Sequence, residues 1–267
     1  MATSCGYEFK LKHFGFDDCT KREFYLSQWG RSKIIFIVYR IILFLYWTGW
    51  VIFGTIEYSG HERGWAYYVF LSHWDEWLMV FNFGISLSVA IYGYSQLDEH
   101  DSGGLRWFHK LSWATRSVST TVAYVVTILF WALVKTTAKA STAVNIHRHA
   151  LNAVFVTVDL FVSRVPVRLL HFVYPMLIGI TYVLFTYIIH AADVMSSFYR
   201  NALDWEKVPV TSIVLCILAV LVAVPLLHSL TFGMYHLRAF IARRIATSSQ
   251  IKELTGTSNQ AFETEVI

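Results

Sequence analysis

Six apolar runs, each long enough to cross a lipid bilayer, dominate this sequence. They cover residues 33–55, 68–94, 117–135, 145–163, 170–191 and 209–232. About 20 apolar residues, at 1.5 Å per residue, span the roughly 30 Å of hydrocarbon in a bilayer. Because backbone N–H and C=O groups find no water there, each run is predicted to be a helix. We therefore expect an all-α, polytopic membrane protein with six transmembrane helices.

The distribution of basic residues predicts how these helices are oriented. Lys and Arg are more frequent before the first run and after the second, fourth and sixth runs than they are after the first, third and fifth. Lys135 and Lys139 oppose this trend. This bias places both termini in the cytoplasm. The chain then divides into a cytoplasmic amino-terminal arm (1–32), a six-helix membrane domain (33–244) and a cytoplasmic tail (245–267), which its polar composition predicts to be disordered.

The overall charge and the chain end bear on binding partners. The net charge is +4, and topology accounts for it because the basic residues flank the apolar runs. We therefore expect membrane lipids around the protein and no nucleic-acid partner. The last three residues, 265–267, resemble carboxyl termini that protein domains capture by strand addition, so the tail is a candidate site for a protein partner.

Polar residues inside the fourth run are the most unusual local feature. At 100° per residue, five of them fall within an arc of about 80° on a helix. They are Asn145, His149, Asn152, Asp159 and Ser163. Polar and ionisable groups are costly at membrane depth and indicate a functional interior. The fourth run is therefore predicted to be a helix with one polar stripe.

The second run carries a matching stripe. Its members are Ser72, Asp75, Asn82 and Ser86. Runs two and four start on the same side of the membrane, since an even number of crossings separates their starts. Ser72 and His149 each lie one to two turns from that start, so both are expected at similar depth. If the two helices pack together, the hydroxyl and the imidazole face each other.

A hydroxyl facing an imidazole is the arrangement used in nucleophilic catalysis. We predict Ser72 as nucleophile and His149 as the general base that takes its proton. Asp75 is the nearer carboxylate to orient the histidine, and Asn152 is a candidate oxyanion donor. Asp159 lies ten residues, about 15 Å, farther along the helix, and is expected to be structural or to sit deep in a pocket.

A purely structural interpretation stands beside the catalytic one. Serine in membrane helices commonly bonds to the preceding turn, and histidine commonly joins helices. Asp159 would then pair with Arg164 or Arg168 or with a neighbouring hydroxyl. Four histidines, at positions 73, 147, 149 and 190, have no spacing typical of a metal site. We expect neither a metal ion nor another cofactor.

Several motifs resemble the rolling stone family of multi-pass membrane proteins. They are EFKLKHFGF and FYLSQWG in the arm, the long run HALNAVFVTVDLFVSRVPVRLLHFVYPMLIGITYVLF, and NALDWEKVP. The resemblance covers nearly the whole chain except the tail. That family is known for a role in myoblast fusion at the plasma membrane. It implies a cell-surface protein, in the plasma membrane rather than the endoplasmic reticulum.

Two elements are also similar to the androgen-induced transmembrane family, whose members hydrolyse fatty acid esters of hydroxy fatty acids. In FLSHWD, Ser72 takes the place of that family's catalytic threonine, and Asp75 matches an acidic position. His149 takes the place of its histidine, with Asp159 matching a later acidic residue. This resemblance implies a serine-type lipid ester hydrolase acting on an acyl ester. The alternative is a non-catalytic protein of cell fusion or adhesion.

Overall fold

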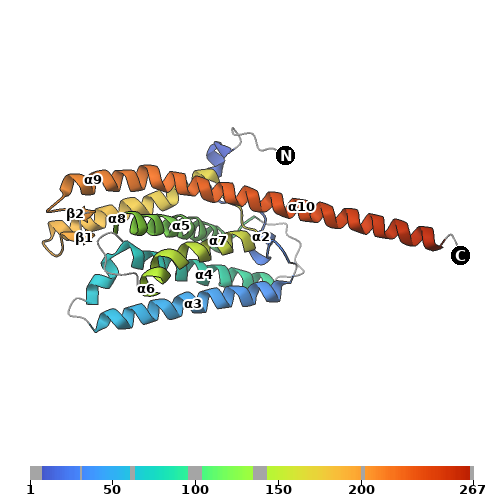
Figure 1. Cartoon of the computed structure of the whole chain (residues 1–267), viewed down its shortest axis with the longest axis horizontal. Helices are drawn as coiled ribbons and strands as arrows, with labels where there is room; N and C mark the ends of the chain where they lie inside the picture. The colour runs from blue at the N-terminus through green and yellow to red at the C-terminus, as the bar shows by residue number, and fades with distance from the viewer. Residues whose placement is uncertain are drawn as a thin grey trace.

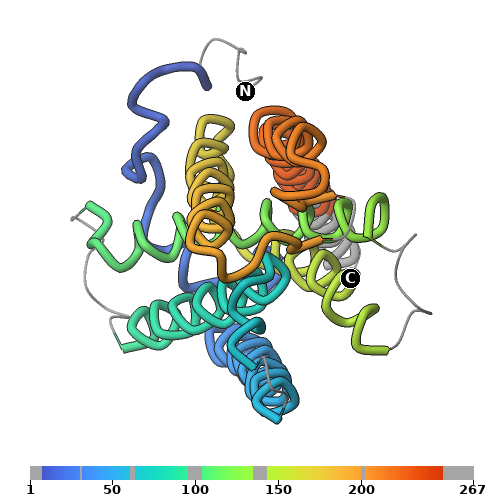
Figure 2. The backbone as a smooth tube through the Cα atoms, turned by 90° about the vertical axis from the view of Figure 1, so that its left-hand side faces the viewer, coloured from blue at the N-terminus to red at the C-terminus, as the bar shows by residue number. Residues whose placement is uncertain are grey.

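The computed structural model of this chain describes residues 8–30, 32–60, 64–95, 104–134, 143–199 and 202–264, with side chains described up to residue 248. The first long helix, α3 (Lys33–Ser59), and the last one run along the long axis of the molecule, and the last one extends well past the others (Figure 1). Seen end-on, α3 and α9 (Pro209–Ile217) lie on opposite sides of the bundle (Figure 2).

Within the described ranges, five helical stretches are long and apolar enough to cross a membrane. They are α3 (Lys33–Ser59), α4 (Leu71–Ser95), α5 (Trp107–Leu129) with the π-helical segment η3 (Phe130–Val134), η5 (Leu169–Phe172) with α8 (Val173–Ala191), and Pro209–Ser248. The last stretch comprises α9 (Pro209–Ile217), the π-helical segment η6 (Leu218–Ala223) and much of α10 (Val224–Thr264). The all-α, polytopic class is thereby confirmed, and five of the six predicted runs are long helices.

The fourth predicted run forms a broken helix. It consists of α6 (Ala143–Ile146), the π-helical segment η4 (His147–Leu151) and α7 (Asn152–Val162). Two charged side chains, Arg148 and Asp159, interrupt its apolar character. A crossing by this segment, the total of six spans and the cytoplasmic placement of both termini remain predictions.

The two ends of the bundle differ. At one end, here the hairpin end, β1 (Ser197–Tyr199) pairs antiparallel with β2 (Leu203–Asp204), beside the 3-10 helix η2 (Gly64–Val69). The Asp204 carboxylate accepts hydrogen bonds from the backbone N–H groups of Glu206 and Lys207, which closes the turn toward α9. At the opposite end, here the arm end, residues 8–30 carry η1 (Leu11–Phe14) and α2 (Arg22–Tyr25).

The amino-terminal arm packs onto the helices at the arm end. Trp29 Nε1 donates to the carbonyl of Phe161 at 2.8 Å, and the Ser27 hydroxyl donates to that of Val162 at 3.2 Å. The imidazole of His171 lies 3.0 Å from the carbonyl of Gly15. These contacts tie the arm to both α7 and η5, so the described part of the arm belongs to the folded body.

The segment predicted as a disordered tail continues the last helix. α10 runs to Thr264 and projects past the arm end (Figure 1). The helix therefore occupies most of 245–267, where the polar composition favoured disorder. Residues 265–267, the candidate site for a protein partner, lie outside the described residues.

A buried carboxylate joins three helices near the arm end. The Asp159 side chain on α7 contacts Arg40 of α3 and Arg116 of α5, each at 2.6 Å, and accepts a hydrogen bond from Tyr39 at 3.1 Å. Arg116 also donates to the backbone carbonyl of Asp159 at 2.7 Å. Of the expected partners of Asp159, the hydroxyl on a neighbouring helix is present as Tyr39, whereas two arginines inside other helices take the place of Arg164 and Arg168. Its structural role agrees with the sequence-based expectation.

Substitution of Asp159 by Asn should destabilise the protein strongly. The change preserves the shape of the side chain but leaves two buried guanidinium groups without an anion. Removing one member of a buried ion pair costs about 3–5 kcal/mol. Unfolding by sodium dodecyl sulfate in mixed micelles would measure the loss.

Asp193→Asn is the matched control, because Asp193 is exposed at the hairpin end and its φ of 55° suits Asn equally well. Equal unfolding free energies for both variants would contradict a stabilising role for the Asp159 cluster.

Candidate functional site

The two polar stripes predicted from the sequence face the interior of the bundle. Eight of the nine stripe residues are at most 8% exposed, and the ninth, Asn145, is partly exposed. On α4 the buried ones are Ser72, Asp75, Asn82 and Ser86, and on η4, α7 and the cap that follows they are His149, Asn152, Asp159 and Ser163. The side chains of Asp75 and Asn152 touch, so the second and fourth runs are in contact, as the pairing of Ser72 with His149 requires.

Asn152 links three helices through its side chain. Its Nδ2 donates to Asp75 at 2.8 Å, and its Oδ1 accepts from the Thr127 hydroxyl on α5 at 3.0 Å. Asp75 therefore contacts Asn152 and not His149, which corrects its expected orienting role. The amide of Asn152 is engaged as well, so it does not supply the expected oxyanion donor.

Glu76 is the centre of a second buried cluster, at the hairpin end. Its carboxylate lies 2.8 Å from Arg148 Nε and 2.9 Å from His73 Nδ1. It also accepts hydrogen bonds from Trp50 and Tyr67, both at 3.1 Å. Because Arg148 lies within η4, this ion pair joins α4 to the segment that carries His149.

Sequence reasoning gave Glu76 no partner. The available signal was Arg148, a basic residue beside His149 in an apolar run, which requires a buried anion. Helical periodicity identifies the face of each residue but not the residue it meets on another helix.

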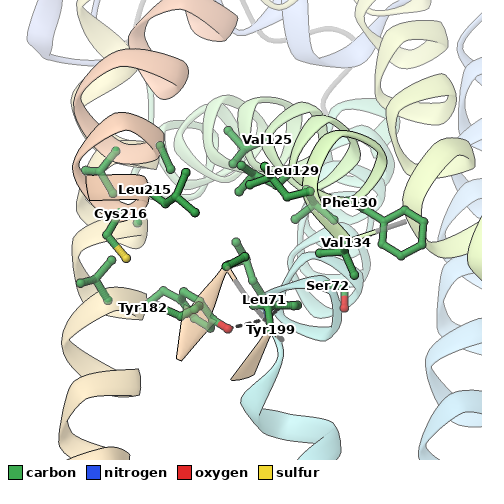
Figure 3. Close-up of a pocket in the computed structure, with 18 of the residues that line it drawn as sticks. Leu71, Ser72, Val125, Leu129, Phe130, Val134, Tyr182, Tyr199, Leu215 and Cys216 are labelled. Atoms are coloured by element: carbon green, nitrogen blue, oxygen red, sulfur yellow. Dashed lines mark hydrogen bonds between the residues drawn. The ribbon is translucent and has the colours of Figure 1, made fainter. Parts of the chain in front are cut away.

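Ser72 and His149 line the same cavity. It has a volume of about 120 Å³ and lies between α4, α5, α8 and η6, under the β hairpin. Figure 3 shows Ser72 on one wall with Phe130 and Val134, and Cys216 on the opposite wall. The two residues predicted to form the site are thus brought to one apolar chamber.

The environment of His149 fixes its ring but leaves one nitrogen available. The imidazole stacks on Phe130 with ring centroids 3.6 Å apart and planes 8° apart. The backbone carbonyl of His149 accepts from Trp131 Nε1 at 2.9 Å. Nδ1 is buried and has no hydrogen-bond partner within the part of the chain that the structure describes. The side chain is held by stacking, and it keeps a nitrogen free to exchange a proton.

Two tyrosines close the cavity beside Ser72. The backbone N–H of Leu71 donates to the hydroxyl of Tyr199 at 2.9 Å and to that of Tyr182 at 3.2 Å. The Tyr182 hydroxyl in turn donates to the carbonyl of Val69 at 3.1 Å. Sequence reasoning missed both tyrosines, since tyrosine is also typical of membrane interfaces. They tie the hairpin and α8 to the start of the helix that carries Ser72.

All three π-helical segments found in the described residues contribute to this cavity. η3 supplies Phe130, η4 supplies His149, and η6 supplies Ala219 and Val220. A π turn is rare and less favourable than an α-helical turn, and it occurs frequently at functional sites. Their meeting at one chamber is a further observation that supports a functional role for it.

Comparison with known proteins identifies relatives over most of the chain. A family model described as "Protein rolling stone" matches residues 1–252. Protein rolling stone of Drosophila melanogaster is 24% identical over 254 residues, which cover 88% of this chain and 90% of that protein. No solved structure matches. The family match includes every residue of the cavity and of the two buried clusters.

The Glu76–Arg148 pair predicts a specific pattern of stabilities. Glu76→Gln preserves an acceptor for Trp50 and Tyr67 but leaves Arg148 buried without an anion, which should cost about 3–5 kcal/mol. Adding Arg148→Met removes the unpaired cation and should recover most of that loss. Detergent unfolding of both variants provides the measurement.

Glu57→Gln serves as the control, because Glu57 is exposed on α3 at the same end. The loss of unfolding free energy in the double variant is compared with the losses in Glu76→Gln and Arg148→Met alone. If it equals the sum of those two losses, the pair does not act as a unit.

Proposed function

The chain belongs to the rolling stone family, and we propose that this integral membrane protein hydrolyses lipid (fatty acyl) esters with Ser72 and His149. The observation that carries the proposal is their position on the wall of one apolar cavity. Small-molecule sites are typically apolar chambers with a few polar groups that fix the ligand. An ester fits this chamber because its acyl chain is apolar and its carbonyl is polar.

The reaction proceeds in two balanced steps. In the first, Ser72 Oγ attacks the ester carbonyl carbon, His149 takes the hydroxyl proton, and the alcohol leaves with that proton. In the second, water attacks the acyl-serine while His149 again accepts and returns a proton. The fatty acid is released, and the serine hydroxyl is restored.

The proposed site is a dyad rather than a triad, because Asp75 is hydrogen-bonded to Asn152. Within the described residues no hydrogen bond joins Ser72 to His149. Catalytic hydrogen bonds in ligand-free sites are often long and tighten only when substrate binds. We propose that an ester in the cavity brings the hydroxyl and the imidazole within reach.

A second candidate function is a non-catalytic role in cell–cell fusion or adhesion at the plasma membrane. What favours it is that Asp75, Asn152 and Asp159 all form contacts between helices. These contacts explain why much of both polar stripes is polar, and they need no catalytic role for those residues. The working surface would then lie outside the membrane, and the tail would engage a protein partner.

A serine-directed fluorophosphonate separates the two functions. The unmodified protein should be labelled, Ser72→Ala should abolish labelling, and His149→Ala should slow it at least about 100-fold, the usual contribution of a general base. Labelling is measured by fluorescence after gel electrophoresis of protein purified in detergent. Unfolding curves verify that each variant remains folded.

Two variants control for nonspecific effects. Ser88→Ala removes an exposed serine from the same helix, and His190→Ala removes a histidine at the hairpin end of α8. Both should label like the unmodified protein. The hydrolase proposal fails if the parent is not labelled, or if Ser72→Ala is labelled equally well.

A further inference from the structure

The attack proposed for Ser72 creates a negative charge that needs a hydrogen-bond donor. When the serine oxygen bonds to the ester carbonyl carbon, the carbonyl oxygen becomes an oxyanion. Among aliphatic side chains this oxyanion is stabilised only by donors that are already in place. Asn152 does not supply one, because its amide is engaged with Asp75 and Thr127. The donor must therefore come from another residue of the cavity.

Tyr199 lies at the point where the donor is needed. It lines the cavity, and Figure 3 draws it beside Leu71 at the start of α4. Its hydroxyl oxygen accepts a hydrogen bond from the backbone N–H of Leu71 at 2.9 Å. The same hydroxyl interacts with the side chain of Ser72, the next residue along the helix. The phenol of Tyr199 is therefore a direct neighbour of the proposed nucleophile.

The hydrogen of the Tyr199 hydroxyl is available to a ligand, whereas that of Tyr182 is not. Tyr182 donates its hydrogen to the carbonyl of Val69 at 3.1 Å. Within the described part of the chain, the Tyr199 hydroxyl donates to no backbone carbonyl, and its neighbours are the hydroxyls of Ser72 and Tyr182. A hydroxyl can donate as well as accept. A carbonyl oxygen in the cavity can thus take the Tyr199 hydrogen without breaking a bond to the backbone.

The start of α4 also makes Tyr199 a stronger donor. Leu71 is the first residue of this helix, so its N–H has no acceptor inside the helix and lies at the positive end of the helix dipole. Hydrogen bonds in a chain polarise one another. Because the Leu71 N–H draws electron density from the phenol oxygen, the Tyr199 hydrogen becomes more positive.

The hairpin holds Tyr199 in place before any ligand binds. Tyr199 pairs with Leu203 across the two strands, and its carbonyl accepts from the N–H of Ala202 at 2.9 Å. Its ring meets that of Phe70 edge to face, with the ring centroids 5.7 Å apart. A donor that is fixed in advance needs no reorganisation when charge develops on the substrate.

We propose that the Tyr199 hydroxyl donates a hydrogen bond to the carbonyl oxygen of the ester and stabilises the oxyanion that forms when Ser72 attacks. The proton remains on Tyr199, and His149 alone accepts the serine proton. The oxyanion role rests on the proposed function, whereas a hydrogen bond to a bound carbonyl requires no reaction. The two parts are therefore tested separately.

A ketone tests the hydrogen bond to a carbonyl. The probe is 2-undecanone, which is uncharged and cannot be hydrolysed, and the protein carries Ser72→Ala so that no covalent adduct forms. The infrared difference between the ordinary ketone and the ketone isotope-labelled at its carbonyl carbon isolates the C=O stretching band. A hydrogen bond lowers this frequency. A band below that of the ketone in protein-free detergent is expected, and adding Tyr199→Phe should abolish it.

Two controls accompany this measurement. Tyr182 still accepts from the Leu71 N–H in Tyr199→Phe, so this variant should stay folded, which unfolding curves verify. Tyr187→Phe makes the same change at an exposed position on α8 and should keep the low-frequency band. Tyr199 is not the donor if that band is absent, or if it persists unaltered in Tyr199→Phe.

Labelling by the fluorophosphonate tests the oxyanion role, because attack on phosphorus also places negative charge on an oxygen. With Ser72 intact, Tyr199→Phe should lower the labelling rate at saturating probe at least about 100-fold, the usual effect of removing one oxyanion donor. The half-saturating probe concentration should change little, since the charge appears only after attack. Tyr187→Phe should label like the unmodified protein.

The remaining outcomes separate this role from the proposed function. An unchanged rate at saturating probe, with or without weaker binding, would show that Tyr199 stabilises no oxyanion. If the unmodified protein is not labelled, the proposed function fails and the oxyanion role fails with it. The infrared band alone then decides whether Tyr199 binds a carbonyl group in the cavity.

Discussion

The ion pairs of Asp159 with Arg40 and Arg116 are the contact on which the arrangement of the helices depends. An ion in hydrocarbon has no water to solvate it, so these three side chains are stable only when α3, α5 and α7 are together. Burial of such charges is expensive, and it specifies one packing more strongly than it increases stability.

The Glu76–Arg148 pair has the same role at the hairpin end. It fixes η4 against α4, and one turn away the Asn152 amide joins α7 to α4 and α5. Both contacts lie at the hairpin end of the interface that α4 forms with η4 and α7. The cavity lies beside this interface, where the lining side chains are aliphatic and do not fill the space.

Much of this arrangement follows from the sequence, but its pairings do not. Apolar run lengths predicted the long helices, and helical periodicity predicted that Ser72, Asp75, His149 and Asn152 face inward. Parity of the crossings placed the starts of the second and fourth runs on the same side of the membrane, but it did not show that the two runs touch. Periodicity assigns a face and not a partner, so Asp75 was given the wrong partner, and the two arginines that pair with Asp159 were not identified. Tyr199 reaches the cavity from a hairpin distant in sequence, which no local pattern reveals.

The π-helical segments have a further consequence, which concerns chain length rather than residue identity. A π turn holds one residue more than an α-helical turn. Deleting one residue from His147–Leu151 would restore an ordinary helix and rotate the preceding residues by about 100° relative to Asn152 and Asp159. The helix would shorten by only about 1.5 Å. A single deletion there would thus exchange the side chains that face the cavity and also turn residues such as Arg148 away from their partners on α4, a combined change that no substitution could reproduce.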